Sequence, residues 1–209
     1  MNARGSVLSI PRQDAAFLLR CMSFVFLVVG ALAAGYVSYV IVDAHTYQAM
    51  ETYRFHAAPP RRGELPRALA DGEIIGQIHV PRIGINVMVV QGDSAPILRR
   101  AVGHVPGTAL PGERGNVALA GHRDTFFRPL REIRPGDQIL MQTPAGQFSY
   151  SVDSARVVPP NDVSVLQPSE ATELTLITCF PFNFLGAAPY RFIVRARQTE
   201  ATLLQTDQP

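Results

Sequence analysis

This chain is predicted to fold mainly as an all-β domain, either a closed barrel or an antiparallel sandwich, with only short helices. From Glu73 onward, short β-like runs alternate with turns rich in glycine, proline and aspartate. The hydrophobic fraction of 47% in 209 residues is enough for one substantial core. A single long uncharged run precedes this region and is set apart by its composition.

The expected strands are short and evenly spaced, which is typical of a sandwich or a barrel. They are Ile74–Pro81, Asn86–Gln91, Asn116–Ala120, Gln138–Thr143, Gln147–Val158, Leu174–Cys179 and Tyr190–Ala196. Short helical pieces are expected near Ala95–Val102, Phe126–Ile133 and Val163–Leu166. The segment around His104, Gly103-His-Val-Pro-Gly107, is rich in turn residues, and no strand is expected to lead into it.

The uncharged run, residues 21–42, is as long as a helix needs to be to cross the hydrocarbon core of a membrane. A cleaved signal peptide is the competing interpretation, but this run is longer than a usual signal-peptide core. It also continues past the small residues Ala33-Ala-Gly35. An uncleaved anchor is therefore expected.

The charges on either side of the anchor predict its orientation. Three arginines precede it, at positions 4, 12 and 20, whereas Asp43 and Glu51 follow it before the next arginine, Arg54. By the positive-inside rule the N-terminus is cytoplasmic and the rest of the chain lies outside the cytoplasm. The expected organisation is a cytoplasmic segment 1–20, an anchor 21–42, a helical stalk 43–72, a catalytic barrel 73–198 and a C-terminal tail 199–209.

The basic residues exclude some functions. The formal net charge is only +2, and no basic stretch interleaved with aromatic residues is present, so nucleic-acid binding is not expected. All 19 basic residues are arginine. The chain therefore has no lysine side chain that could act as a nucleophile or form a Schiff base.

Cys179 is the candidate nucleophile because it ends an apolar, β-rich run that Pro181 stops two residues later. The other cysteine, Cys21, lies at the edge of the anchor, so a disulfide between the two is not expected. A single thiol is more often a buried, inert side chain than a reactive one. Whether Cys179 is inert or reactive therefore depends on the residues that surround it.

A reactive thiol needs a base, and two histidines are candidates. His122 follows a β-like run that breaks at Gly121, which is the same arrangement as the one at Cys179. His104 remains a candidate partner on spacing alone, since such pairs form in space rather than in sequence.

Stabilising an oxyanion requires a fixed donor, and the last β-like run offers three arginines. Arg191, Arg195 and Arg197 share one face of that run by alternation. In a half-buried strand this face is commonly just the solvated one, and Arg191 is the functional candidate because it is closest in sequence to Cys179. Arg123 is interpreted as a structural or rim residue, and Asp124 as a residue that bonds the local loop.

Three segments resemble the signature segments of sortases, the membrane-anchored cysteine transpeptidases. They are TLITC at 175–179, LAGHRDTFFRPL at 119–130 and APYRFIVRA at 188–196. The similarity continues through residues 72–92, 102–121 and 133–143, and so covers most of 72–197. In detail it resembles the class D branch, without the lid motif of the pilin-polymerising members.

The resemblance implies a closed eight-stranded sortase barrel in which Cys179 is the nucleophile, His122 the general acid/base and Arg191 the group that holds the substrate carbonyl and stabilises the oxyanion. Thr178, Leu119 and Ala120 are expected to bind substrate. His104 is demoted, because it falls in a segment without a chemical role in the family. No cofactor and no metal ion is expected, and the scattered acidic residues show no calcium-ligand spacing.

The implied reaction is cleavage between Thr and Gly of an LPXTG-like C-terminal sorting signal through a thioacyl enzyme. Transfer follows to an amine on a cell-wall precursor or another protein, and the enzyme would be classed with the thiol peptidases. A barrel-shaped binding module without turnover and a purely hydrolytic cysteine peptidase are the alternatives. The sequence does not identify the variable positions of the signal or the acceptor.

Overall fold

The computed structural model describes residues 12–57, 69–184 and 186–203. The chain divides into two compact units, residues 1–43 and 44–209. The strands are β1 (Ile74–Val80), β2 (Ile85–Gln91), β3 (Val102–His104), β4 (Gly115–Ala120), β5 (Gln138–Thr143), β6 (Gly146–Val158), β7 (Thr172–Phe180) and β8 (Tyr190–Leu203). The helical elements are α1 (Arg12–Ala57), α2 (Ala95–Arg100) and the 3-10 turns η1 (Pro81–Ile83), η2 (Arg128–Glu132) and η3 (Val163–Leu166).

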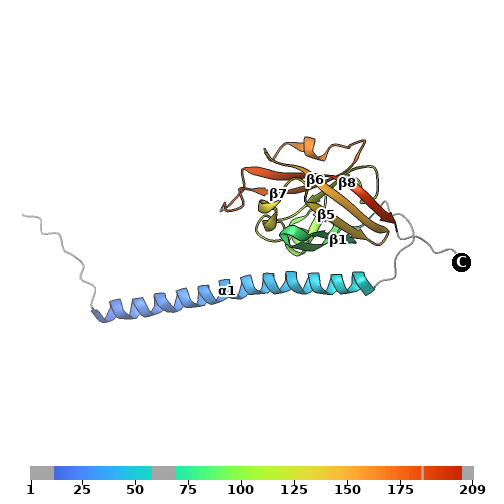
Figure 1. The fold of residues 1–209 in the computed structure, drawn as a ribbon. Coiled ribbons are helices and arrows are strands. Elements are labelled where there is room, and N and C mark those ends of the chain that lie inside the picture. The colour runs from blue at the N-terminus through green and yellow to red at the C-terminus, as the bar shows by residue number, and fades with distance from the viewer. Residues whose placement is uncertain (1–11, 58–68, 185, 204–209) are drawn as a thin grey trace, which may run out of the picture. The chain divides into compact units, whose positions relative to one another are not determined.

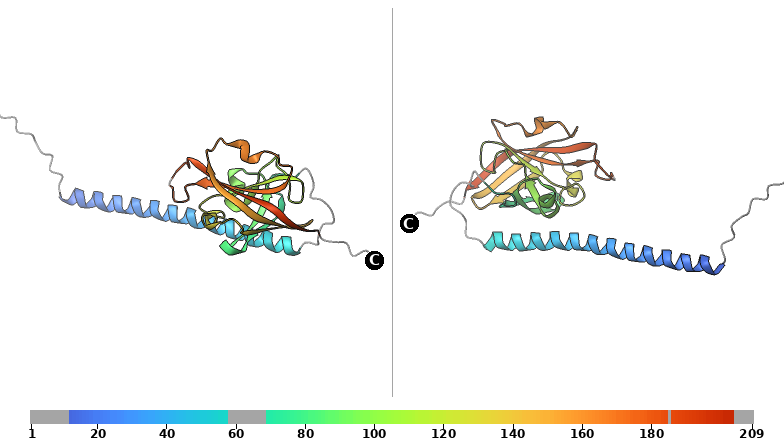
Figure 2. Two further views of the ribbon diagram at one scale, coloured as in Figure 1. Left: turned by 45° about the horizontal axis from the view of Figure 1, so that its top comes forward. Right: turned by 180° about the vertical axis from the view of Figure 1, so that it is seen from behind.

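The helix α1 is one uninterrupted element that contains the expected anchor (Figure 2). From Ala16 onward it is long and apolar enough to cross a membrane. Large apolar side chains along it, such as Phe24, Leu27 and Leu32, are about 70% exposed in the structure. An apolar surface of this extent is unusual in water and is expected of a helix embedded in lipid.

The eight strands form a closed barrel in the order β1-β2-β3-β4-β7-β8-β6-β5, with β5 pairing back to β1 (Figure 1). Two of the pairs, β2–β3 and β4–β7, are parallel, and the others are antiparallel. The predicted all-β class is therefore confirmed, and of its two forms the closed barrel is the one observed. The long strands β6 and β8 run side by side as far as the pair Gly146 and Leu203.

Alternation along the strands separates an inner core from a smaller outer cluster. Leu174 and Leu176 of β7 point inward and pack with Val194 of β8 in the main core. Ile177 and Ile193 lie on the opposite, outer face, where they pack under η3 with Val158, Val165 and Leu166. The outer face of β7 and β8 is therefore covered over part of its length.

The structure corrects the prediction for the segment around His104, which ends a strand. β3 is only three residues long, and Gly103 at its centre passes so close to Gly92 that a Cβ atom would lie 2.2 Å from the Gly92 carbonyl oxygen. His104 is buried, with its ring nitrogens 2.8 Å from Gln91 Oε1 and 2.9 Å from the Ala109 carbonyl oxygen. It holds loops together inside the barrel wall.

Candidate active site

The parallel pair β4–β7 brings the candidate histidine next to the candidate nucleophile. Ala120, the last residue of β4, is paired with Ile177 of β7, and the Gly121 amide donates to the Ile177 carbonyl oxygen at 3.1 Å. His122 follows Gly121 directly, and Thr178 and Cys179 follow Ile177. Parallel strands end at the same edge of a sheet, so both reactive side chains leave the barrel at one place.

Gly121 allows the turn that carries His122 to pack tightly. A Cβ atom at this position would lie 2.7 Å from the ring of Phe127, which is fully buried. The His122 carbonyl oxygen accepts from the amides of Thr125 at 3.4 Å and Phe127 at 3.1 Å. The backbone on both sides of the imidazole is therefore fixed by the core and by the following turn.

Thr178 joins the ends of the two strands. Its hydroxyl donates to the Gly121 carbonyl oxygen at 2.7 Å, and its side chain is buried. Because neighbouring side chains on a strand point to opposite faces, an inward Thr178 places Cys179 on the outer face. The thiol is free and half-buried. Phe180 points inward again and contacts the rings of Phe182 and Phe192.

Arg191 of β8 is directly opposite Cys179 in the antiparallel pair β7–β8. Its Nη1 donates to the carbonyl oxygens of Tyr190 at 3.0 Å and Ala188 at 3.3 Å. No carboxylate contacts its guanidinium within the described part of the chain. Arg191 is therefore a cation beside the thiol that is not neutralised by an ion pair.

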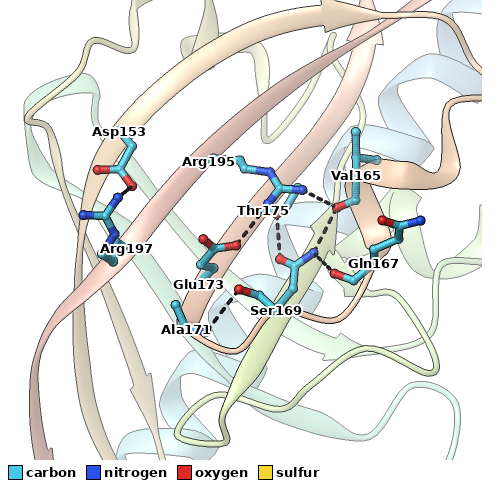
Figure 3. Close-up of polar contacts among 10 residues, drawn as sticks. Asp153, Val165, Gln167, Ser169, Ala171, Glu173, Thr175, Arg195 and Arg197 are labelled. Atoms are coloured by element: carbon cyan, nitrogen blue, oxygen red, sulfur yellow. Dashed lines mark hydrogen bonds and ion pairs between the residues drawn. The ribbon is translucent and has the colours of Figure 1, made fainter.

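The two other arginines on this face are engaged elsewhere (Figure 3). Arg195 Nη1 contacts Glu173 Oε2 at 3.0 Å, and its Nη2 donates to the Val165 carbonyl oxygen at 3.4 Å. Arg197 forms an ion pair with Asp153 at 3.1 Å. The structure thus gives a physical reason for choosing Arg191 among the three.

One cavity of about 340 Å³ collects the candidate residues. Its lining residues are His122, Arg123, Asp124, Cys179, Gly186, Ala187, Ala188 and Arg191. They come from the turn after β4, the end of β7, the segment between β7 and β8, and the start of β8. Two arginines and one aspartate give the wall a cationic excess, which suits a substrate whose reaction develops negative charge.

The residues expected to bind substrate do not line this cavity. Leu119 is fully buried in the barrel core and Thr178 is 2% exposed, so neither offers a surface to a peptide. Both point inward by strand alternation, which places them behind the site. Ala120 is half-buried on the outer face of β4, beside Ile177.

Three small residues of the cavity wall, Gly186, Ala187 and Ala188, were not predicted as site residues. Their only signal in the sequence is their position shortly before Arg191. Arg123, interpreted from sequence as a structural or rim residue, also lines the cavity and bonds the segment between β7 and β8. Among the described residues, no group of three or more His, Cys, Asp or Glu side chains is arranged to hold a metal ion.

This arrangement has the parts needed for acyl transfer by a cysteine. A thiol stands at the end of a rigid strand, an imidazole leaves the neighbouring strand at the same edge, and an unneutralised guanidinium lies opposite the thiol. A nucleophile, a proton-transfer group and an oxyanion donor around one cavity form a recognisable site for attack on a carbonyl carbon.

Comparison with known proteins gives consistent matches. Residues 78–199 match the family model of the sortase domain. The chain is 30% identical over 184 residues to sortase D of Bacillus subtilis, which spans 81% of this chain and 93% of that protein. It is 31% identical to sortase SrtE1 of Streptomyces coelicolor over 87% of this chain and 57% of that protein.

Solved structures agree with these matches. A sortase D5 transpeptidase of Clostridium perfringens superimposes with a TM-score of 0.65 at 25% identity, covering 76% of this chain and 99% of that one. Sortase E1 of Streptomyces coelicolor, solved with a tripeptide in its active site, gives a TM-score of 0.58 at 31% identity. That match covers 68% of this chain and 98% of the other.

Proposed function

This chain belongs to the sortase family, with a class D-like domain, and we propose that it cleaves an LPXTG-like sorting signal between Thr and Gly through a thioacyl enzyme. Family membership makes it a cysteine transpeptidase that acts on sorting signals. The proposal concerns the motif, the intermediate and the residues that carry the reaction.

In the proposed first step, His122 takes the proton of the Cys179 thiol, and the sulfur attacks the carbonyl carbon of the threonine in the signal. The new C–S bond forms as the carbonyl oxygen takes up negative charge, and Arg191 donates hydrogen bonds to that oxygen. The C–N bond to glycine then breaks, and His122 gives its proton to the leaving amine. The product is a thioester between the substrate and Cys179.

In the second step, an amine attacks the thioester carbonyl. A C–N bond forms and the C–S bond breaks, while His122 accepts the proton that the amine loses and returns it to the Cys179 sulfur. Arg191 again faces the oxygen that becomes negative. The acceptor is an amine on a cell-wall precursor or another protein, and water in its place would give hydrolysis.

The anchor fits a substrate that is itself held at the membrane. An apolar helix long enough to cross the bilayer precedes the barrel, and the arginines before it predict a cytoplasmic N-terminus. We propose a single-pass protein with its catalytic unit outside the cytoplasm. Holding enzyme and substrate in the same membrane raises the effective concentration of one for the other.

The observation that carries the proposal is the register that sets Cys179 opposite Arg191, with His122 leaving the adjacent strand into the same cavity. His122 lies more than fifty positions from Cys179 in sequence, and the barrel brings the two to one cavity. A barrel that served only for binding would not need an unneutralised cation beside a free thiol.

Product analysis tests the proposed reaction. The full-length protein in detergent is incubated with a sorting-signal peptide, with and without a glycine-based amine, and the products are identified by mass spectrometry. The amide between threonine and the added amine is expected, and Cys179→Ala should give none. If the only product at every amine concentration were the peptide fragment that ends in a threonine carboxylate, the protein would be a hydrolytic peptidase instead.

A further inference from the structure

The segment between β7 and β8 is bound by hydrogen bonds from two arginines. Arg123 Nη2 donates to the carbonyl oxygens of Phe184 at 2.6 Å and Gly186 at 3.0 Å. Arg191 Nη1 donates to those of Ala188 and Tyr190. Three carbonyl groups of this segment, and that of Tyr190 at the start of β8, therefore accept hydrogen bonds from guanidinium groups.

The side chain of Arg123 is half-buried rather than free in solvent. The central carbon of its guanidinium lies 5.9 Å from the centre of the Phe184 ring, which is within the range of a cation–π contact. Its Nη1 atom is buried and has no hydrogen-bond partner within the described ranges. An arginine whose only role was solubility would keep its head group in water.

The place of Arg123 in the chain makes these bonds significant for the cavity. It directly follows His122, and residues 122–124 form one part of the cavity wall, while Gly186, Ala187 and Ala188 form another part. The Arg123 bonds therefore join the wall that carries the imidazole to the wall made of small residues. The hydrogen bond from Thr178 to Gly121 joins β7 to the residue before His122, and it does not involve the segment between β7 and β8.

We propose that Arg123 is a positioning residue, which holds Phe184 and Gly186 at a fixed distance from His122 and so shapes the cavity for the peptide. The inference rests on the proposed roles of Cys179 and His122. Without Arg123, the wall has to be ordered each time a peptide binds, and ordering a segment on binding weakens affinity. The reacting groups themselves stay in place, because β4, β7 and β8 hold them.

Replacing Arg123 by alanine should therefore raise KM for a sorting-signal peptide by about tenfold and lower kcat by less than about threefold. Arg123→Lys keeps the charge but not the planar fork that binds two carbonyl groups, and should give an intermediate KM. Phe184→Leu removes only the ring contact and should change KM by less than about twofold. Arg131→Ala is the matched control, because Arg131 is exposed on η2 and, among the described residues, its side chain makes a polar contact only with Glu132.

Two further measurements on the full-length protein separate positioning from other roles. Amide hydrogen exchange at residues 186–190 should speed up in Arg123→Ala and not in Arg131→Ala. The rate of Cys179 alkylation by iodoacetamide between pH 6 and 9 should stay within about twofold of the parent, since the Arg123 guanidinium is directed to the carbonyl groups of Phe184 and Gly186.

An unchanged KM together with unchanged exchange at 186–190 would overturn the proposal. A changed alkylation profile would also overturn it, because Arg123 would then act on the thiol. A fall in thermal stability with unaltered KM would assign a merely structural role. If the parent protein gave no transfer product, the proposed function would fail, and the exchange measurement would still decide whether Arg123 holds the segment.

Discussion

The outer face of β7 and β8 carries arginine residues at both ends, but their charged partners differ. At one end, Arg195 and Arg197 are paired with Glu173 and Asp153, and the loop with η3 covers the strands (Figure 3). At the other end, Arg191 faces the free thiol of Cys179 in an open cavity without a carboxylate partner. We call these the closed end and the open end.

The closed end also contains a buried network of hydrogen bonds. Asn116 Nδ2 donates to the carbonyl oxygens of Val165 at 2.9 Å and Gln167 at 3.4 Å, and its Oδ1 accepts from the Thr175 hydroxyl at 2.7 Å. Polar groups that satisfy each other stabilise the fold. At the open end, the charge of Arg191 is not neutralised by a carboxylate among the described residues and is available to a substrate. One end of this strand pair thus contributes to the stability of the fold, and the other end carries the candidate site.

The largest expected difference between the two ends is in catalysis. Arg191→Ala should lower kcat by about 100-fold to 1,000-fold, which is typical for the loss of one oxyanion donor. Arg195→Ala removes a cation from the same face and should change kcat by less than about threefold. Steady-state transfer kinetics of both variants test this, and equal losses would erase the distinction between the ends.

Thr175 and Cys179 lie on the same face of β7, and their replacement should lower the free energy of unfolding by different amounts. Thr175→Val is nearly isosteric but leaves Asn116 Oδ1 buried without its donor, which should lower the free energy of unfolding by about 1–3 kcal/mol. Cys179→Ala should lower it by much less, because the thiol is half-buried and has no recorded hydrogen bond. Urea unfolding of the two variants measures the difference. A larger loss in Cys179→Ala would show that the thiol is structural.

The two histidines offer a third comparison, with the smallest effect. Burial is the main cause that lowers the pKa of His104 below its usual value of 6.5. The unfolded chain therefore binds a proton first as the pH falls, so this contribution to stability is complete above about pH 6.5 and declines below it. One proton corresponds to a slope of at most about 1.4 kcal/mol per pH unit.

Unfolding by urea between pH 7.5 and 5 measures this slope, with His104→Gln as the variant that cannot titrate. The pKa of Asp137 is lowered from 3.8 by its hydrogen bond to Arg82, so its own contribution is lost only at more acidic pH. A slope that is the same in parent and variant would exclude His104 as its source. His122→Gln, at the open end, should remove activity.

Much of this architecture could be predicted from the sequence. The strand runs gave the all-β class, and the signature segments gave the sortase resemblance, which the family match confirms. Seven of the eight strands have predicted counterparts, but β3 was missed. Three residues with a central glycine carry no alternation that a pattern could detect, and only the close approach to Gly92 explains the strand.

The site was only partly predictable, because the sequence shows where strands end but not which distant residues contact each other. Strand ends can be read from sequence, so Cys179, His122 and Arg191 were proposed, and the structure places them at one cavity while their roles remain predictions. Leu119 and Thr178 were expected to touch substrate, although strand alternation turns them inward. The bonds from Arg123 to Phe184 and Gly186 join residues about sixty positions apart, and no local pattern predicts them.

Trapping the thioacyl enzyme tests the central claim most directly. The full-length protein is mixed with a sorting-signal peptide without an amine, quenched in acid, and analysed by intact and peptide-level mass spectrometry. The account predicts an adduct that contains the peptide up to threonine, attached to Cys179 and released by added amine. An adduct at Cys21, or turnover of the peptide that persists in Cys179→Ala, would contradict it.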